Sequence, residues 1–406
     1  MPKKTVKLLL VLALAVCMLT ACDVSSLLGG GQATQICTTV TVYVTPSATV
    51  TPSPSSYVQQ GLEGLVAPNG ELLKVHFIDV YQGDAIFVEF PDGTNMLIDA
   101  GENSSVKTDM LLTYLNSALD QDVNGVLSDS EKVIDRLMLT HTDSDHVGGM
   151  DNVLDAYTIN KIYMPKIGLP LEPENAGGTA KAAQLGTIST VVYKTFYEKA
   201  IAETAEGGGS AEIIFNVGIY SIANATAGYT MDVYCQSEEY YSNICNNSDG
   251  EDKNNMSPIA ILSFGGRQVC LTGDASWTQG SANCIPAELN FMALAAERVN
   301  KDVDVLKAGH HGSDSSSGTD FLDFLKPEYV VTTNGDADNG SSSQTPDDDF
   351  NSGNTYDHPN AATVSRLYKA GVKALFRTDR HGNILLTVGT NGGMSFATTV
   401  NAACTY

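Results

Sequence analysis

Short apolar stretches and segments of helical spacing alternate along the chain from residue 71 onward. The stretches LLKVHFIDV, DAIFVEF and NMLIDAG are separated by YQG and PDGT, and apolar runs between such turn signals indicate strands. The segment SVKTDMLLTYLNSAL has the apolar spacing of an amphipathic helix, and VIDRLMLTH then indicates a strand that ends at His141. GGMDNVLDAY and a small-residue stretch near 178–205 favour helices on either side of an extended KIYMP.

The second half of the chain continues this alternation without repeating the sequence. YTMDVYC, SPIAILSFGG, RQVCLTGDA, VDVLKAG, PEYVVTTN, VKALFRT and NILLTV indicate strands, whereas IPAELNFMALAAERVN and NAATVSRLYKAG favour helices. The polar segments 240–256 and 334–357 indicate long surface loops. Because no boundary is visible within 71–406, we expect one domain, and this mixture of elements is typical of two sheets with outer helices.

The first 70 residues differ from the rest in composition. MPKKTVK is basic, LLLVLALAVCM is an apolar run shorter than the roughly 18 residues of a spanning helix, and LTAC brings small residues before Cys22. Residues 1–22 therefore resemble a bacterial lipoprotein signal, with an ordinary signal peptide cleaved near Ala21 as the alternative. Residues 23–70 are rich in Ser, Thr, Pro and Gly, which favours an extended tether. We expect an exported protein, anchored through a lipid on Cys22 to the outer face of the bacterial cell membrane.

The net charge limits which partners the chain can attract, and the cysteine spacing limits which metal sites and disulfides it can form. The formal net charge of −24 repels polyanions at long range, and the chain has no run of Lys and Arg that would neutralise nucleic-acid phosphates. No C-x-x-C pair occurs, so a cysteine zinc cluster is not expected. Cys235 and Cys245 flank a short polar loop and are the best candidates for a disulfide outside the cytoplasm.

The stretch LTHTDSDHVGG carries the strongest chemical signal. His141, Asp143, Asp145 and His146 lie within six residues, between an expected strand and an expected helix. Alternate residues of an extended segment project to the same side. Two imidazoles and two carboxylates packed there would be costly to bury unless a cation holds them, so the stretch predicts a metal-binding cradle.

Further polar residues follow apolar strands elsewhere in the chain. Asp274 follows one strand in LTGDAS, and His310 and His311 follow another in VLKAGHHGS. With HFIDVYQGDAIFVEF, LIDAG, LTHTDSDHVGG, SPIAILSFGG, YDHP and FRTDRHGNI, these stretches resemble the metallo-β-lactamase superfamily over about 74–390. More narrowly, they resemble the extracytoplasmic hydrolase domain of the ComEC competence family. The resemblance implies a mixed α/β (α+β) fold, an αββα four-layer sandwich over 71–406 with the site on one edge.

The resemblance also implies a role for individual residues. The implied metal ligands are His141, Asp143, Asp145, His146, Asp274 and His310. Asp274 would bridge two ions, and Asp145, His146 and Asp274 would form the catalytic set. Asp99 would orient the cradle from behind, as groups that support metal ligands do. The residues that would contact the substrate are His311, His358 and Arg380, and for His358 a structural role in its loop is the alternative.

Residues 147–309 contain no histidine, which affects the expected metals. One site would be formed by His141, Asp143 and Asp274, and the other by Asp145, His146, Asp274 and His310. Carboxylates suit Mn²⁺ and imidazoles suit Zn²⁺, so we expect two divalent ions, zinc or manganese. Two ions about 3.5–4 Å apart can activate water and stabilise an in-line displacement at phosphorus.

The favoured function is therefore a surface-anchored, metal-dependent phosphodiesterase or nuclease, with DNA as a candidate substrate. Since a fold does not fix a substrate, hydrolysis of a lactone, a β-lactam or a small phosphodiester stays open. A non-catalytic binding lipoprotein is the alternative from another class. No protein partner is inferable from the sequence.

A second cation loop is predicted at DQDVNGVLSDSE. Asp120, Asp122, Asn124, Gly125 and Glu131 match the calcium-loop spacing D-x-[DN]-x-[DN]-G-x₅-E, in which alternating oxygens wrap the ion. A solvated acidic loop is the alternative. Two other histidines are assigned no chemistry, because His76 is expected in the core and His381 on the surface.

Overall fold

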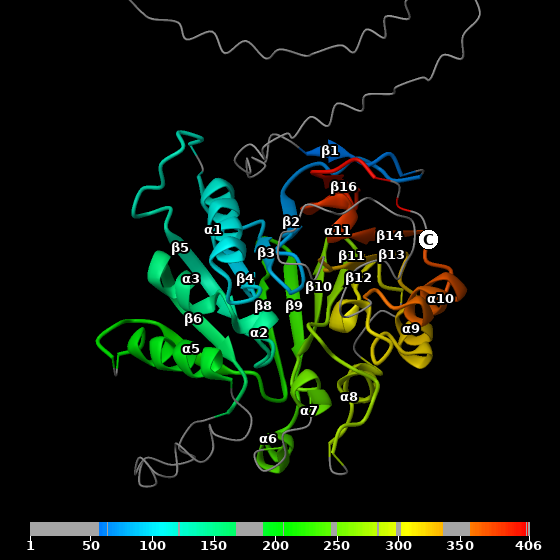
Figure 1. Ribbon diagram of the computed structural model, residues 1–406. Coiled ribbons are helices and arrows are strands. Elements are labelled where there is room, and N and C mark those ends of the chain that lie inside the picture. Colours follow the sequence, from blue (N-terminus) through cyan, green and yellow to red (C-terminus); the bar gives the residue numbers. More distant parts are fainter. Residues whose placement is uncertain are drawn as a thin grey trace, which may run out of the picture. The chain divides into compact units, whose positions relative to one another are not determined.

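Two β-sheets form the centre of the computed structural model (Figure 1). The residues that the structure describes are 57–62, 64–120, 122–167, 190–205, 207–244, 250–281, 284–297, 302–335, 358–402 and 404. The expected signal segment, most of the expected tether and Cys245 lie outside them, while Cys235 is a buried free thiol. No helix among the described residues is long and apolar enough to cross a membrane.

Each sheet combines antiparallel and parallel strands. The first has the order β1-β16-β15-β2-β3-β4-β5-β6-β7. Its strands are β1 Val58–Gln59, β2 Leu72–Phe77, β3 Ile86–Glu89, β4 Asn95–Ile98, β5 Val133–Met138, β6 Thr158–Met164, β7 Glu212–Phe215, β15 Ile384–Gly389 and β16 Met394–Thr398. The second has the order β14-β13-β12-β11-β10-β9-β8. Its strands are β8 Ile219–Asn224, β9 Tyr229–Tyr234, β10 Ile259–Phe264, β11 Arg267–Leu271, β12 Val305–Lys307, β13 Tyr329–Thr332 and β14 Ala374–Arg377.

Strand alternation explains how the layers are formed. In β2, Leu73, Val75 and Phe77 enter the apolar layer between the two sheets. His76 faces the other side, where its Nδ1 lies 2.7 Å from the Tyr114 hydroxyl and its Nε2 lies 2.8 Å from Glu89 Oε1. The expectation that His76 is a satisfied core residue is confirmed.

Helices cover the outer face of each sheet (Figure 1). The apolar layer outside the first sheet includes residues of α1 Ser105–Leu119, α3 Met150–Ala156 and α5 Val191–Ala202. The layer outside the second sheet includes residues of α8 Ala287–Ala295, α9 Thr319–Leu325 and α10 Ala361–Lys369. Helix, sheet, sheet and helix therefore follow one another, which confirms the αββα fold.

The topology brings the sequence-predicted residues to the ends of parallel strands. β4 to β7 run parallel in the first sheet, and β11 to β14 run parallel in the second. The cradle follows β5 and includes the short helix α2 Ser144–Val147, Asp274 follows β11, and the two histidines follow β12 in the turn η3 Gly309–Gly312. Each sheet thus contributes part of the site.

The structure differs from the sequence-based expectations at several boundaries. β5 ends at Met138, so His141 lies in the following turn rather than at the strand end. β1 pairs with β16, so among the described residues hydrogen-bonded structure is already present at Val58, upstream of residue 71. The segment 240–256 includes most of α6 Glu238–Ile244 and all of α7 Gly250–Asn254, and α7 has buried residues. His381, at the end of α11 Thr378–His381, is buried rather than on the surface.

Candidate metal centre

The cradle backbone is fixed against the neighbouring loops of the first sheet. The amide N of Asp84 donates to the Asp145 carbonyl at 3.2 Å, and the amide N of Ala100 donates to the His146 carbonyl at 2.8 Å. A Cβ on Gly149 would lie 2.4 Å from the Ala100 carbonyl oxygen, so no side chain fits there. This close approach explains why glycine follows the cradle.

Three histidines turn the same ring nitrogen toward the centre. His146 Nδ1 lies 2.8 Å from Asp99 Oδ2, and His311 Nδ1 lies 2.8 Å from the Thr333 carbonyl oxygen. Because both partners accept hydrogen bonds, Nδ1 carries the proton and Nε2 keeps its lone pair. His141 Nδ1 lies 3.1 Å from the Thr140 hydroxyl, which itself donates to Asp99 Oδ2 at 2.7 Å.

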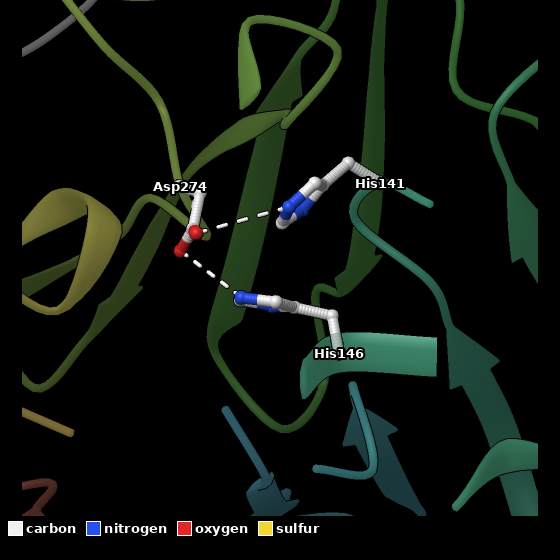
Figure 2. Close-up of side chains that lie close together, drawn as sticks. All are labelled: His141, His146 and Asp274. Carbon is white, nitrogen blue, oxygen red and sulfur yellow. Dashed lines mark ion pairs between the residues drawn. The ribbon is translucent and has the colours of Figure 1, made fainter. Parts of the chain in front are cut away.

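Asp274 faces His141 with one carboxylate oxygen and His146 with the other (Figure 2). Its Oδ2 is 3.7 Å from His141 Nε2, and its Oδ1 is 3.1 Å from His146 Nε2 and 3.5 Å from His311 Nε2. Asp143 Oδ2 lies 3.8 Å from His141 Nε2, and Asp145 Oδ2 lies 3.3 Å from His311 Nε2. The two oxygens of Asp274 therefore face two separate groups of donor atoms.

The positions of the histidine nitrogens in these groups are better explained by binding of a cation than by hydrogen bonds between the histidines. His146 Nε2 and His311 Nε2 are 3.2 Å apart, and when the rings are neutral with Nδ1 protonated, both Nε2 atoms bear lone pairs. A tetrahedral ion with Zn–N bonds of about 2.0–2.1 Å separates two ligand nitrogens by about 3.3 Å. His141 Nε2 is buried and has no hydrogen-bond partner within the described part of the chain. The donor set thus fits divalent metal ions.

The surrounding charges attract positive charge to the same place. Burial lowers the pKa of His311, but Asp274, Asp145 and Asp84 raise it by more, to about 9. Burial likewise opposes protonation of His146, yet the carboxylates of Asp274, Asp99 and Asp145 hold its pKa well above the ordinary value. Without metal, these imidazoles therefore bind protons, and metal ions would displace them.

The geometry favours His311 over His310 as a ligand, in contrast to the prediction. His311 is buried and forms a group with Asp145 and His146 whose donor atoms lie within 4.8 Å of one another. His310 Nε2 lies 3.8 Å from Asp274 Oδ2, and 25% of its side chain is exposed. Both residues adopt left-handed backbone conformations, with φ of 46° and 52°, which are costly for residues with a Cβ. The strained turn sends the two rings to different sides of Asp274.

Comparison with known proteins agrees with this geometry. Residues 78–220 match the family model described as the metallo-beta-lactamase superfamily. The chain contains a metallo-beta-lactamase superfamily domain. It is 25% identical over 326 residues to ComE operon protein 3 of Bacillus subtilis, covering 77% of this chain and 32% of that protein. It is 30% identical over 141 residues to competence protein ComA of Neisseria gonorrhoeae, covering 35% of this chain and 16% of that protein.

The chain therefore spans about a third of one of these relatives and less of the other. These matches confirm the resemblance to competence proteins. Among solved structures, unliganded yeast PDE1 is similar with a TM-score of 0.44 and 8% identity, covering 78% of this chain and 99% of that one. A likeness at this level says nothing about activity.

Two residues beneath the candidate metal centre of the metallo-beta-lactamase domain, Lys307 and Asp84, were not predicted from the sequence. Lys307 is fully buried, and its Nζ lies 2.5 Å from Asp84 Oδ2, 2.8 Å from the Gly273 carbonyl oxygen and 3.9 Å from Asp274 Oδ1. Burial raises the pKa of Asp84, but the Lys307 ammonium, together with His311 and His146, outweighs this effect and holds the pKa below its ordinary value. In the sequence, each of these residues is a charged residue within a mainly apolar stretch: Asp84 in DAIFVEF and Lys307 in VDVLKAG.

The other predicted substrate residues lie at different places. The His358 ring packs edge-on against the His310 ring, with centroids 5.4 Å apart, so it lies beside the centre. Arg380 belongs to α11 and is partly buried. The start of α11 connects to the centre through Asn334, which bonds to Thr378 at one end and to the His311 carbonyl at the other.

The predicted calcium loop brings three carboxylates together. Asp120, Asp122 and Glu131 offer oxygens within 4.8 Å of one another. Asp120 Oδ2 accepts from the Gly125 amide at 2.7 Å, and Gly125 has φ of +80°, a conformation that glycine adopts without strain. The loop joins α1 to β5, so it is not flanked by two helices. Calcium binding there stays a prediction.

Proposed function

We propose that this chain is a metal-dependent hydrolase that cleaves phosphodiester bonds with two divalent ions. The observation that carries the proposal is the position of Asp274, whose two oxygens face separate groups of buried donor atoms. We assign one ion to His141 and Asp143, and the other to Asp145, His146 and His311, with Asp274 shared.

The protein side chains would supply binding and orientation. Asp99 and Thr333 fix His146 and His311 so that Nε2 of each faces the centre. Two divalent ions held there would activate water and stabilise the charge that develops on phosphoryl oxygens. The first group is richer in carboxylate and suits Mn²⁺, whereas the second has two imidazoles and suits Zn²⁺.

The substrate class is supported by the similarity to competence proteins, which favours a nucleic-acid phosphodiester. The net charge of −24 opposes long-range attraction of DNA, so binding would depend on cations at the centre itself. Export and a lipid anchor on Cys22 complete the proposal and are supported by the sequence pattern of residues 1–22 alone. Incorporation of labelled palmitate, lost in Cys22→Ala, tests the anchor.

The deciding experiment measures metal content and hydrolysis on the full chain. We expect two transition ions per chain by elemental analysis after mild dialysis, with hydrolysis of bis(p-nitrophenyl) phosphate and of DNA. Asp274→Ala should retain one ion or none and lose activity, whereas the exposed Asp320→Ala serves as the matched control. Fewer than one ion per chain after loading with Mn²⁺ or Zn²⁺ would contradict the proposal.

A further inference from the structure

The short helix α7 (Figure 1) lies in a segment that the sequence marked as a surface loop. Two of its polar side chains, those of Lys253 and Asn254, contact residues of the metal centre. The Lys253 ammonium donates to Asp143 Oδ1. Asn254 Nδ2 lies 3.4 Å from His310 Nδ1. Consecutive residues of α7 therefore contact the cradle on one side and the histidine turn on the other.

Contacts that do not involve Lys253 hold α7 in place. The buried Asp252 side chain accepts from the Ser281 amide at 2.9 Å, and its carbonyl accepts from the Tyr240 hydroxyl at 2.6 Å. Next to the helix, Asn255 Oδ1 accepts from the Ala287 amide at 2.8 Å. Since α7 is anchored in this way, the position of the Lys253 backbone does not depend on its ion pair.

Lys253 also has donors to spare. An ammonium carries three N–H groups, and Asp143 Oδ1 is its one recorded acceptor among the described residues. The other oxygen of Asp143 faces His141, so the carboxylate can serve a metal ion and the lysine together. Lys253 has 22% of its side chain exposed, whereas Lys307 is fully buried and bonded to Asp84. Of these two lysines, Lys253 is the one that can reach a substrate.

We propose that Lys253 is a substrate-positioning residue that binds a non-bridging oxygen of an anionic phosphodiester beside the metal centre. This inference rests on the proposed function and narrows it. An ammonium at the rim of the site favours an anionic substrate over an uncharged lactone, in a chain whose net charge of −24 otherwise repels anions. Asp143 Oδ1 holds the ammonium in position, and the remaining N–H groups bind the phosphate oxygen.

The test compares Lys253→Met and Lys253→Arg with wild type, as metal-loaded full chains. Lys166→Met is the matched control, because Lys166 is paired with a different carboxylate, that of Glu238, and 25% of its side chain is exposed, close to the 22% of Lys253. Calorimetry measures the Kd of dimethyl phosphate, a diester probe whose binding does not require turnover. We expect Lys253→Met to weaken binding by about tenfold or more, the effect of losing one charge-assisted hydrogen bond. Lys253→Arg should recover part of this affinity, and the control should match wild type.

Two further measurements separate the possible outcomes. For bis(p-nitrophenyl) phosphate, Lys253→Met should raise KM by more than it lowers kcat, while elemental analysis still finds two ions. An unchanged Kd for dimethyl phosphate would overturn the inference, and so would loss of a metal ion, because the lysine would then serve Asp143 instead of the substrate. If wild type binds the probe through Lys253 but hydrolyses no diester, the positioning role stands and the proposed function fails.

Discussion

The buried pair of Lys307 and Asp84 allows a quantitative test of what holds the site together. Lys307→Met removes the ammonium but keeps much of the side-chain volume. Asp84, whose side chain is 1% exposed, then loses its partner at 2.5 Å, and Asp274 loses a positive charge at 3.9 Å. The Gly273 carbonyl loses a donor at 2.8 Å.

The burial of this ion pair determines how large a loss of stability we expect. Removing one partner of a buried ion pair costs about 3–5 kcal/mol, because the remaining charge stays buried without compensation. Native domains are stable by about 5–15 kcal/mol, so this change removes a large share of the free energy of unfolding. In the double variant with Asp84→Asn, no unpaired charge remains at that position, so the cost should fall well below the sum of the single changes.

Urea unfolding of the full chain in EDTA, followed by circular dichroism, measures both effects without a contribution from metal binding. Lys74→Met is the control, because its pair with Glu89 is partly exposed, and it should cost less than about 1 kcal/mol. The reasoning is refuted if Lys307→Met costs less than 1 kcal/mol, or if the Lys307→Met and Asp84→Asn effects are additive.

Three other predictions follow from the same structure. His311→Asn should lose about one ion per chain by elemental analysis while His310→Asn keeps both, and the opposite pattern would restore His310 as the ligand. Burial raises the pKa of Glu288 to about 8, so the folded state keeps a proton that the unfolded state releases near pH 4.5. Wild type should therefore lose stability relative to Glu288→Gln as the pH rises from 5 to 8, by an amount on the order of a few kcal/mol in urea unfolding; a difference independent of pH would contradict this. If the 120–131 loop binds calcium, Ca²⁺ should raise the melting temperature of wild type but not of Asp122→Ala, and equal shifts would exclude the loop.

Local sequence patterns were sufficient for much of the fold. The apolar spacing of SVKTDMLLTYLNSAL predicts the helix that the structure has at Ser105–Leu119. The alternation in β2 predicts which side chains lie between the sheets and which do not. The cradle could also be recognised, because its four polar residues are close in sequence and their proximity does not depend on tertiary structure.

The residues that were missed depend on contacts between distant segments. Whether His310 or His311 faces Asp145 is decided by two left-handed backbone conformations, which a pair of identical residues does not reveal. Lys253 reaches the cradle because Asp252 and its partners anchor a polar segment. His381 is buried, with its ring centroid 5.5 Å from that of Phe376 and its Nδ1 3.0 Å from the Arg377 amide nitrogen, although the surrounding HGN reads as a surface turn.

The division of the donor atoms between the two sheets has a consequence for how the protein matures. His141 and His146 follow a strand of one sheet, while Asp274 and His311 follow strands of the other, far along the chain. No fragment that lacks either sheet holds the complete set, so a complete metal centre would require both halves to be docked. Contacts between segments so far apart in sequence are slow to form, because the entropy of closing the long intervening loop must be lost first. Metal ions bound at the complete centre would then stabilise the docked arrangement of the two halves, because they would bind that arrangement and not the separated halves.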